Sequence, residues 1–534
     1  MSWSTNGRRT ALVTLLLAGA VGLLARLPYV LQADFPLHDG GLFYVMVRDL
    51  QQAHYRLPVF TSYNGLDIPY AYPPLGFYVA GLVDDLTPLA LLDVFRWLPL
   101  VVNLLTIGAF YLLARGLLRK PLAVGAATAA FAVLPRSFEW LIMGGGVTRA
   151  FGFGFAVLAL AAIHRVCTRG DGRSVVLAAL CAGGAALSHP EMAWFVAYSS
   201  VLVVVAYGQG WRTWARVLLA GMGAAAVAAP WWGTVLLRHG IAPFLASGQA
   251  GWNPWGPAAL ASLMISEEHF FPIVGALAFL GAIACLAGRC LFLPVWVLTI
   301  FLVAPRSSLT AVTVPLGLLA GLGLAHVLML GLGEADPFSE HVSERDGAAK
   351  VPGDPWRRRV ALLVVGYALL YTSVTAGAGS LSILTALPLT EREAMEWVAS
   401  ATGPDATFVV ITGERWARDK SSEWFPALAE RRSLGTVQGY EWLGHAEFWP
   451  QVQRSQALER CARAGGECLE AWLDETGASF THVYVAKRPA LPVLDRAEGR
   501  DEECCAALRA ALGADPRYRL VFENDGAAVF ARVE

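Results

Sequence analysis

Charged residues are scarce in this sequence. Asp, Glu, Lys and Arg make up 16% of its 534 residues, and 42 acidic and 41 basic side chains leave a formal net charge of -1. The absence of an excess of positive charge argues against a nucleic acid as partner. Hydrophobic residues make up 56% of the sequence, and its mean hydropathy is positive. This composition is typical of an integral membrane protein.

The N-terminus lacks the small-residue cleavage site of a secretory signal peptide. Arg8 and Arg9 precede an apolar run of about twenty residues, which is long enough to cross a bilayer. We therefore predict that this run is a retained first helix.

Eleven apolar stretches are predicted to cross the membrane. They occupy residues 10–31, 95–114, 121–137, 147–165, 174–188, 190–207, 216–237, 270–287, 290–304, 309–331 and 360–379. Arg and Lys cluster on alternate connections, for example at 115–120, 165–173 and 357–359. Such clusters mark cytoplasmic loops. We therefore expect a multi-pass protein of the plasma membrane, with a cytoplasmic N-terminus and an extracytoplasmic C-terminal part.

Residues 72–90 are apolar enough to form a short helix. Counting them as a crossing would reverse the predicted side of every later loop. The simpler prediction is an interfacial helix within a long first external loop, residues 32–94.

Charged residues become frequent beyond about position 335. Strand-like runs at 407–412, 481–486 and 527–531 alternate with helical stretches. We expect a membrane domain at 1–380 and a soluble extracytoplasmic α/β domain at 381–534. The second part contains Cys461, Cys468, Cys504 and Cys505, whose spacing does not select one disulfide pairing.

Asp39 follows the first predicted span, in the run Pro36-Leu-His-Asp-Gly-Gly-Leu-Phe-Tyr44. Glu139 and Glu267 fall in later loops that are predicted to lie on the same face. Asp39 is suited to cap a helix that starts at Gly41. In the other interpretation, Gly40 and Gly41 let the backbone approach a ligand closely.

The order of one span, a long external loop that opens with Asp-Gly, and a further span resembles the GT-C superfamily of polyprenyl-linked glycosyltransferases. This superfamily includes oligosaccharyltransferases, protein mannosyltransferases and aminoarabinose transferases. The run from His38 to Tyr44, continuing to Arg48-Asp49, is similar to the Asp-Gly-Tyr...Arg-Asp stretch of oligosaccharyltransferases. The resemblance implies a membrane glycosyltransferase that moves a sugar, with inversion, from a polyprenyl phosphate or diphosphate to an extracytoplasmic acceptor. Asp39 would be its base or a metal ligand, and the acceptor would be a glycan, a lipid or a protein.

Glu139 lies where those enzymes carry a second acidic motif, but the Asp-x-Asp pattern is absent here. Glu267 belongs to a Ser-Glu-Glu-His run that is similar to the Ser-Glu-His element of eukaryotic oligosaccharyltransferases. Either Asp39, Glu139 and Glu267 act together as catalytic acids that bind Mg²⁺ or Mn²⁺, or the metal requirement is relaxed. In the alternative interpretation, Glu139 pairs with Arg136 and Glu267 belongs to an ordinary helix cap.

Two arginines are candidates to bind the donor phosphate. Arg306 lies in a very short external turn between apolar spans, where it needs an anion, a headgroup or a carbonyl as partner. Arg149 follows a glycine triple that is suited to wrap a phosphate.

Another tight turn is predicted at residues 188–191, where His189 and Glu191 flank Pro190. We interpret this segment as a helix connector, because proline is favoured in the first turn of a helix.

The start of the predicted interfacial helix is expected to form a groove for the lipid tail, lined by Tyr72, Leu75 and Phe77. In the C-terminal part, residues 422–426 and 438–444 are dense in aromatic and acidic side chains, as sugar-binding surfaces often are. The Trp-Trp-Asp motif of oligosaccharyltransferases is absent, which argues against N-glycosylation of proteins.

Two other functions remain possible from the sequence. A transporter or flippase of lipid-linked sugars would show internal repeats and charges at the centres of spans, and neither pattern is present in the sequence. A non-catalytic assembly or scaffold protein on the same fold would tolerate the missing Asp-x-Asp motif.

Overall fold

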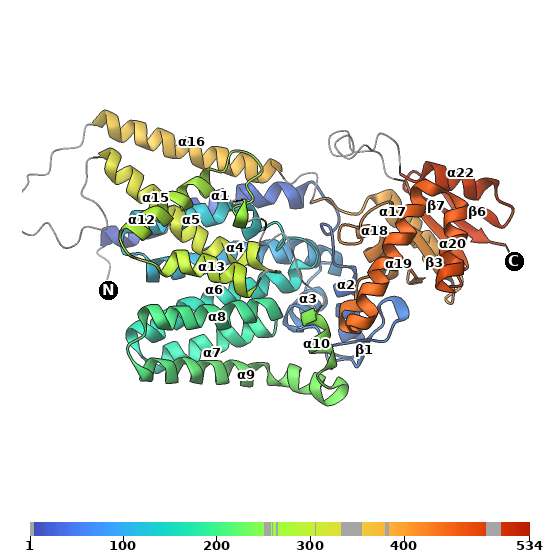
Figure 1. The fold of residues 1–534 in the computed structure, drawn as a ribbon, viewed down its shortest axis with the longest axis horizontal. Helices are drawn as coiled ribbons and strands as arrows, with labels where there is room; N and C mark the ends of the chain where they lie inside the picture. The colour runs from blue at the N-terminus through green and yellow to red at the C-terminus, as the bar shows by residue number, and fades with distance from the viewer. Residues whose placement is uncertain are drawn as a thin grey trace, which may run out of the picture.

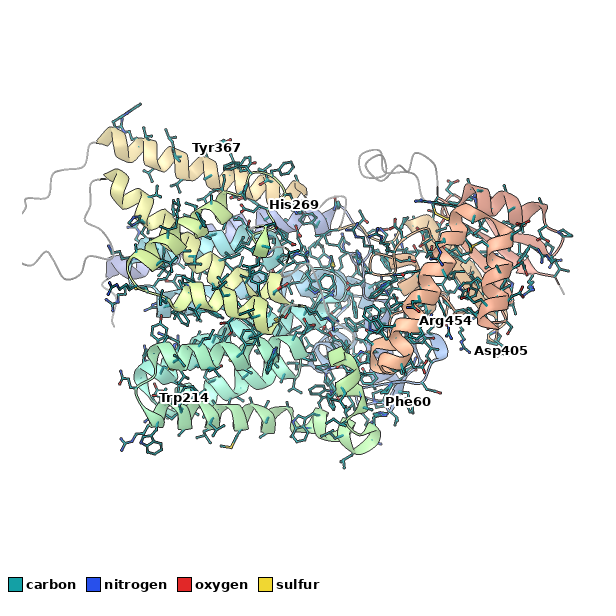
Figure 2. The ribbon with its side chains drawn as sticks, in the orientation of Figure 1. Phe60, Trp214, His269, Tyr367, Asp405 and Arg454 are labelled. Atoms are coloured by element: carbon teal, nitrogen blue, oxygen red, sulfur yellow. A yellow bond between two sulfur atoms is a disulfide. The ribbon has the colours of Figure 1, made fainter. Side chains whose placement is uncertain are left out.

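The chain forms a helical bundle at one end and a smaller mixed region at the other (Figure 1). This computed structural model describes residues 5–249, 258, 260–262, 265–304, 306–332, 355–379, 384–487 and 504–533. The N-terminus lies at the end of the bundle that is far from the C-terminal region. Figure 2 places Trp214 near that far end, and Phe60 of the predicted first external loop beside the C-terminal region.

A helix coincides with each predicted span. These helices are α1 (Thr5–Leu31), α4 (Leu91–Leu117), α5 (Pro121–Val133), α6 (Gly146–Arg169), α7 (Gly172–Ala186), α8 (Pro190–Tyr207), α9 (Trp211–His239), α12 (Ile273–Ala287), α13 (Phe292–Val303), α15 (Thr313–Leu332) and α16 (Pro355–Gly379). Within the described residues, seven spans are long and apolar enough to cross, or eight if α12 and α13, bent by 120°, form one span. Helices α5 and α7 fall short of the roughly 20 residues that a crossing needs. The count of eleven crossings therefore stays a prediction.

The bundle helices pack closely because small residues line their contacts. Between α12 and α15, a Cβ at Gly281 or Gly323 would collide with the backbone of the opposite helix. Arg26 of α1 is fully buried and donates to Asn103 Oδ1 of α4 (2.6 Å) and to the Ala132 carbonyl of α5 (2.6 Å). A buried guanidinium needs such acceptors. They hold α1, α4 and α5 together next to η2 (Pro135–Ser137).

The segment between α1 and α4 contains α2 (Gly41–Gln52), β1 (Phe60–Thr61), η1 (Tyr63–Gly65), β2 (Ile68–Pro69) and α3 (Leu75–Leu86). Helix α3 has 12 residues and is too short to cross a bilayer alone. Its length agrees with the predicted interfacial helix at 72–90. Two further short helices, α10 (Ala242–Gln249) and α14 (Ser308–Ala311), follow α9 and α13.

The C-terminal region contains a five-stranded sheet in the order β4-β3-β5-β7-β6. Its strands are β3 (Thr407–Ile411), β4 (Arg432–Ser433), β5 (His482–Ala486), β6 (Tyr518–Glu523) and β7 (Ala527–Arg532). Strands β4, β3 and β5 are parallel, and β7 is antiparallel to β5 and β6. The three predicted strands coincide with β3, β5 and β7. The predicted domain boundary at 380/381 lies outside the described residues.

The helices of this region are α17 (Leu389–Ala401), α18 (Lys420–Leu428), η3 (Tyr440–Trp442), α19 (His445–Ala464), α20 (Gly466–Thr476) and α22 (Ala506–Ala514). Disulfides join Cys461 to Cys468 and Cys504 to Cys505. One hydrophobic cluster extends from α2 and α3 into the sheet and contains Phe77, Trp424 and Phe408. The C-terminal region is therefore packed against the segment that carries Asp39.

Candidate active site

Asp39 lies in a tight turn between α1 and α2. The backbone of His38 is left-handed at φ 56°, and Gly40 has φ 132°, which favours glycine. A Cβ at Gly40 would lie 3.1 Å from the Gly144 backbone and from the Trp424 ring. Helix α2 begins with Gly40 at its N-cap position, and no described side chain caps it. The interpretation of Asp39 as the cap of this helix is therefore wrong, because its carboxylate points elsewhere.

The carboxylate of Asp39 forms an ion pair with Arg149. Arg149 Nη2 donates to both oxygens, at 2.9 and 2.7 Å, and the Gly145 amide donates to Oδ1 at 3.0 Å. The side chains of Arg149 and Asp39 are 8% and 17% exposed. Gly145 is the N-cap of α6, so Asp39 also lies where the helix dipole favours an anion.

Opposing effects act on the pKa of Asp39. Burial raises the pKa, but the charge of Arg149 and the hydrogen bond from Gly145 outweigh burial, so the pKa lies below its ordinary value. Asp39 is therefore ionised at neutral pH. Arg149 also lies over the ring of Trp140, with 4.1 Å from Cζ to the ring centroid.

Tyr72 and His189 lie beside this ion pair. Their rings are 6.2 Å apart, and Thr148, the neighbour of Arg149, donates to the Tyr72 hydroxyl at 3.4 Å. Burial raises the pKa of Tyr72, and the charges of Arg149 and Arg306 oppose this effect. The resulting pKa is about 12. Burial and the same two arginines lower the pKa of His189 to about 3, so its ring is neutral. Both side chains are thus within electrostatic reach of both arginines.

Two buried polar atoms in this group have no hydrogen-bond partner among the described residues: Arg149 Nε and His189 Nδ1. Buried donors and acceptors are normally paired, so orphaned atoms need an explanation. A polar ligand with oxygen acceptors would satisfy the Arg149 donor and bring the neutral His189 ring into a hydrogen bond. Pro190 begins α8, as expected for a helix connector, and His189 lies at the N-cap position of that helix.

Arg306 is half-exposed and pairs with Glu191, with Nε 2.7 Å from Oε1. Its Nη1 also approaches the Ser247 carbonyl of α10 at 3.4 Å. The charge of Arg306 acts on Tyr72, His189 and Glu441 of η3. Arg306 therefore belongs to the same neighbourhood as Asp39 and Arg149, at its exposed side.

The C-terminal region contributes two acids to the site, the buried Glu423 and the partly exposed Glu441. Glu423 of α18 accepts the Gly40 amide at 2.9 Å, next to Asp39 in the chain. Burial and the Asp39 charge raise the pKa of Glu423 to about 8, and burial raises the pKa of Glu441. The dense acidic and aromatic runs around these residues were the sequence signal, but nothing in the sequence connects them to Asp39.

Glu139 and Glu267 have basic partners other than the arginine that binds Asp39. Glu139 Oε1 pairs with His269 Nε2 at 2.6 Å, and Glu267 pairs with Arg136. Figure 2 shows His269 close to α16. These three acids do not form a metal-holding group among the described residues, so the predicted shared metal site is wrong. Their joint role as catalytic acids stays a prediction. The pairs seen here are His269 with Glu139 and Arg136 with Glu267.

A divalent cation does not fit these residues. Both oxygens of Asp39 face the Arg149 guanidinium, whose positive charge would repel a metal ion at the same carboxylate. No group of three His, Cys, Asp or Glu side chains in the described part of the chain is placed to hold a metal ion. We therefore derive no step that involves Mg²⁺ or Mn²⁺.

The predicted lipid groove is only partly accessible in this structure. Phe77 is fully buried and contacts Tyr70 and Tyr72, with ring centroids 6.2 and 5.8 Å apart. Leu75 and Tyr72 are partly exposed. Phe77 is therefore a core residue here, so its expected role as a groove wall is wrong for this conformation.

No protein-family model and no curated protein sequence matches this chain. Solved structures do. The oligosaccharyltransferase AglB of Archaeoglobus fulgidus, in complex with an inhibitory peptide and a dolichol-phosphate, is 15% identical, with a TM-score of 0.56 over 90% of this chain and 70% of AglB. ArnT of Cupriavidus metallidurans, bound to undecaprenyl phosphate, is 16% identical, with a TM-score of 0.53 over 99% of both chains. The arabinofuranosyltransferase AftD from Mycobacteria is 15% identical, with a TM-score of 0.54 over 100% of this chain and 40% of AftD.

These three structures are GT-C glycosyltransferases. At such low identity the likeness concerns the fold, and it confirms the GT-C-like membrane fold that the sequence predicts. Substrates and site residues do not follow from it.

Proposed function

We propose that this chain, which has the GT-C fold, is a membrane glycosyltransferase that moves a sugar from a polyprenyl phosphate or diphosphate to an extracytoplasmic acceptor. The observation that carries the proposal is the buried Asp39–Arg149 pair, whose Arg149 Nε and neighbouring His189 Nδ1 have no described partner. Two structures of the same fold were solved with a polyprenyl-type phosphate, which supports such a donor.

The donor phosphate is assigned to Arg149 and Arg306. Arginine binds phosphate through charge-assisted hydrogen bonds, and Arg149 Nε is an available buried donor. Arg306 is half-exposed and bound to Glu191 at the surface of the site. Both cations stabilise the negative charge that develops on the departing phosphate, as a metal ion would otherwise do.

Asp39 is assigned as the base. As the acceptor oxygen attacks the anomeric carbon from the face opposite the phosphate, its proton passes to Asp39. The bond between the anomeric carbon and the phosphate oxygen breaks, and its electron pair leaves with the phosphate. The configuration at the sugar is therefore inverted. The charge of Arg149 keeps Asp39 ionised before the proton arrives.

Donor binding would also strengthen this base. In the free protein, Arg149 depresses the pKa of Asp39. A phosphate on Arg149 compensates the positive charge, so the affinity of Asp39 for a proton rises only when the donor is bound. The site would thereby become basic in the complex that can transfer the sugar.

The test is transfer by the purified protein in liposomes that contain a series of polyprenyl-phosphate and polyprenyl-diphosphate sugars, with glycan, lipid and peptide acceptors. Wild type should form a product with inverted configuration from one donor, and Asp39→Asn should form almost none. Movement of the intact donor across the bilayer without transfer would establish a flippase. Equal cellular function of wild type and Asp39→Asn, with no transfer by either, would favour a scaffold.

A further inference from the structure

Helix α18 brings a carboxyl group of the C-terminal region against the turn that carries Asp39. Asp419 caps the helix by accepting the Ser422 amide at 3.0 Å, which fixes where α18 begins. One turn later, Glu423 is 7% exposed, and its Oε1 accepts the Gly40 amide at 2.9 Å. The other oxygen faces the Gln438 amide at 3.4 Å.

The turn is held by several groups of the same region. Trp424 Nε1 donates to the His38 carbonyl at 3.0 Å, and the His38 amide donates to the Thr385 carbonyl at 3.0 Å. Tyr63 of η1 donates to the Glu423 carbonyl at 2.7 Å, which ties α18 to the first predicted external loop. Left-handed backbone such as that of His38 persists only where its surroundings hold it.

We propose that Glu423 is a positioning residue for Asp39: by binding the Gly40 amide it keeps the Asp39 carboxylate on Arg149, so that the C-terminal region completes the active site. The geometry gives the reason. Glu423 holds the peptide unit directly after Asp39, and Gly145 and Arg149 bind the side chain of the same residue. Loss of the acceptor leaves a buried amide without a partner, and the turn can then relax.

This role calls for an oxygen acceptor on Glu423 and no charge. Asp39, Arg149 and Glu441 are the charged groups that act on Glu423, and the Asp39 charge together with burial raises its pKa. An uncharged carboxyl still accepts the Gly40 amide through its carbonyl oxygen. A glutamine has nearly the same shape and also offers an oxygen acceptor. Glu423→Gln should therefore keep the hydrogen bond to the Gly40 amide, whereas Glu423→Ala should lose it.

The chain offers a matched control on the same interface. Glu430, just after α18, pairs with Arg48 of α2 at 3.1 Å, and these side chains are 58% and 42% exposed. Glu430→Ala removes a contact between the same two regions without touching the turn at 38–41. A general weakening of the interface would therefore appear in Glu430→Ala as well.

The first measurement is hydrogen exchange of the full-length protein in detergent, read on peptides that cover residues 37–44. Glu423→Ala should speed exchange of the Gly40 amide by about tenfold or more, while Glu423→Gln and Glu430→Ala stay within about twofold of wild type. This readout needs no substrate, so it tests the positioning whether or not the proposed function is right. Unchanged exchange in Glu423→Ala would overturn the inference.

The second measurement rests on the proposed function and uses the liposome transfer assay. Glu423→Ala should lower kcat by about tenfold to a hundredfold with a smaller change in KM, and Glu423→Gln should restore most of it. A glutamine variant as slow as alanine would overturn the role assigned to the uncharged group. Altered exchange with no transfer by wild type would keep the positioning role and reject the proposed function.

Discussion

Two acid–base clusters lie at the loops of this protein, and they differ in what they leave unpaired. The Asp39 cluster consists of Asp39, Tyr72, Arg149 and His189, and it contains buried polar atoms with no partner among the described residues. The Glu139 cluster consists of Arg136, Glu139, Glu267 and His269, in which each acid has its own base. Its side chains are also more exposed on average.

The difference between the two clusters indicates that one can bind a substrate and that the other stabilises the fold. An ion pair whose groups satisfy one another holds two loops together and has little left for a substrate. A pair with a spare buried donor can take up another anion. The comparison therefore predicts that substitutions in the Asp39 cluster act on turnover, whereas those in the Glu139 cluster act on stability.

The largest effect is expected from Asp39→Asn. Loss of the base should lower transfer by about a hundredfold to ten-thousandfold, because a proton acceptor supplies that much of the rate. Asparagine keeps an oxygen for Arg149 and the Gly145 amide, so the variant should still fold and elute as wild type. Glu267→Gln, the matched change in the Glu139 cluster, should retain turnover. Equal losses in both variants would break the distinction between the clusters.

A smaller effect is expected from the half-exposed Arg306, with the partly exposed Arg136 as its control. Arg306→Ala should raise KM for the donor by about tenfold to a hundredfold, since one charge-assisted hydrogen bond to phosphate is lost. Arg136→Ala should leave this KM unchanged because Arg136 is engaged with Glu267. Titration with donors of one and two phosphates would show which donor depends on Arg306. An unaltered KM in Arg306→Ala would remove Arg306 from the donor site.

The contribution of the Glu139 cluster to the stability of the protein should depend on pH. The hydrogen bond to Glu139 raises the pKa of His269 above its ordinary value, although burial opposes this. Its stabilisation is therefore complete below the pKa of an unfolded histidine, about 6.5, and is lost as the pH rises through the folded pKa. Thermal unfolding should show Glu139→Gln less stable than wild type at acid pH, with a smaller gap at alkaline pH. A gap that widens with pH would contradict the assignment.

The smallest effect is expected from chelation. Because Arg149 supplies the positive charge at Asp39, EDTA should change transfer by less than about twofold, and added Mg²⁺ or Mn²⁺ should not raise it. The control is Arg149→Ala, which should stay inactive with either metal. Loss of turnover in EDTA, restored by a divalent ion, would show that the carboxylates rearrange around a metal in the working enzyme.

Local chemistry explains what could be predicted from the sequence. The apolar runs predicted helices at all eleven positions, because the length and hydropathy of a run are local properties. Asp39 stood out because a short motif with two glycines carries its own conformational requirement, which the close approach of Gly40 to Gly144 and Trp424 explains. The strands around 407, 482 and 527 followed in the same way from short strand-like runs placed between helical stretches.

Only the tertiary structure decided which charges meet. The sequence placed Asp39, Glu139 and Glu267 on one face, yet it could not show that Arg149, Arg136 and His269 each pair with one of them. Such pairing depends on the distances between loops that are more than a hundred residues apart in the sequence. A local sequence pattern contains no information on these distances. The same holds for Glu423, whose contact with Gly40 spans 383 positions and exists because the C-terminal region packs on the first loop. Composition and periodicity therefore determined the membrane fold, and long-range packing determined the site.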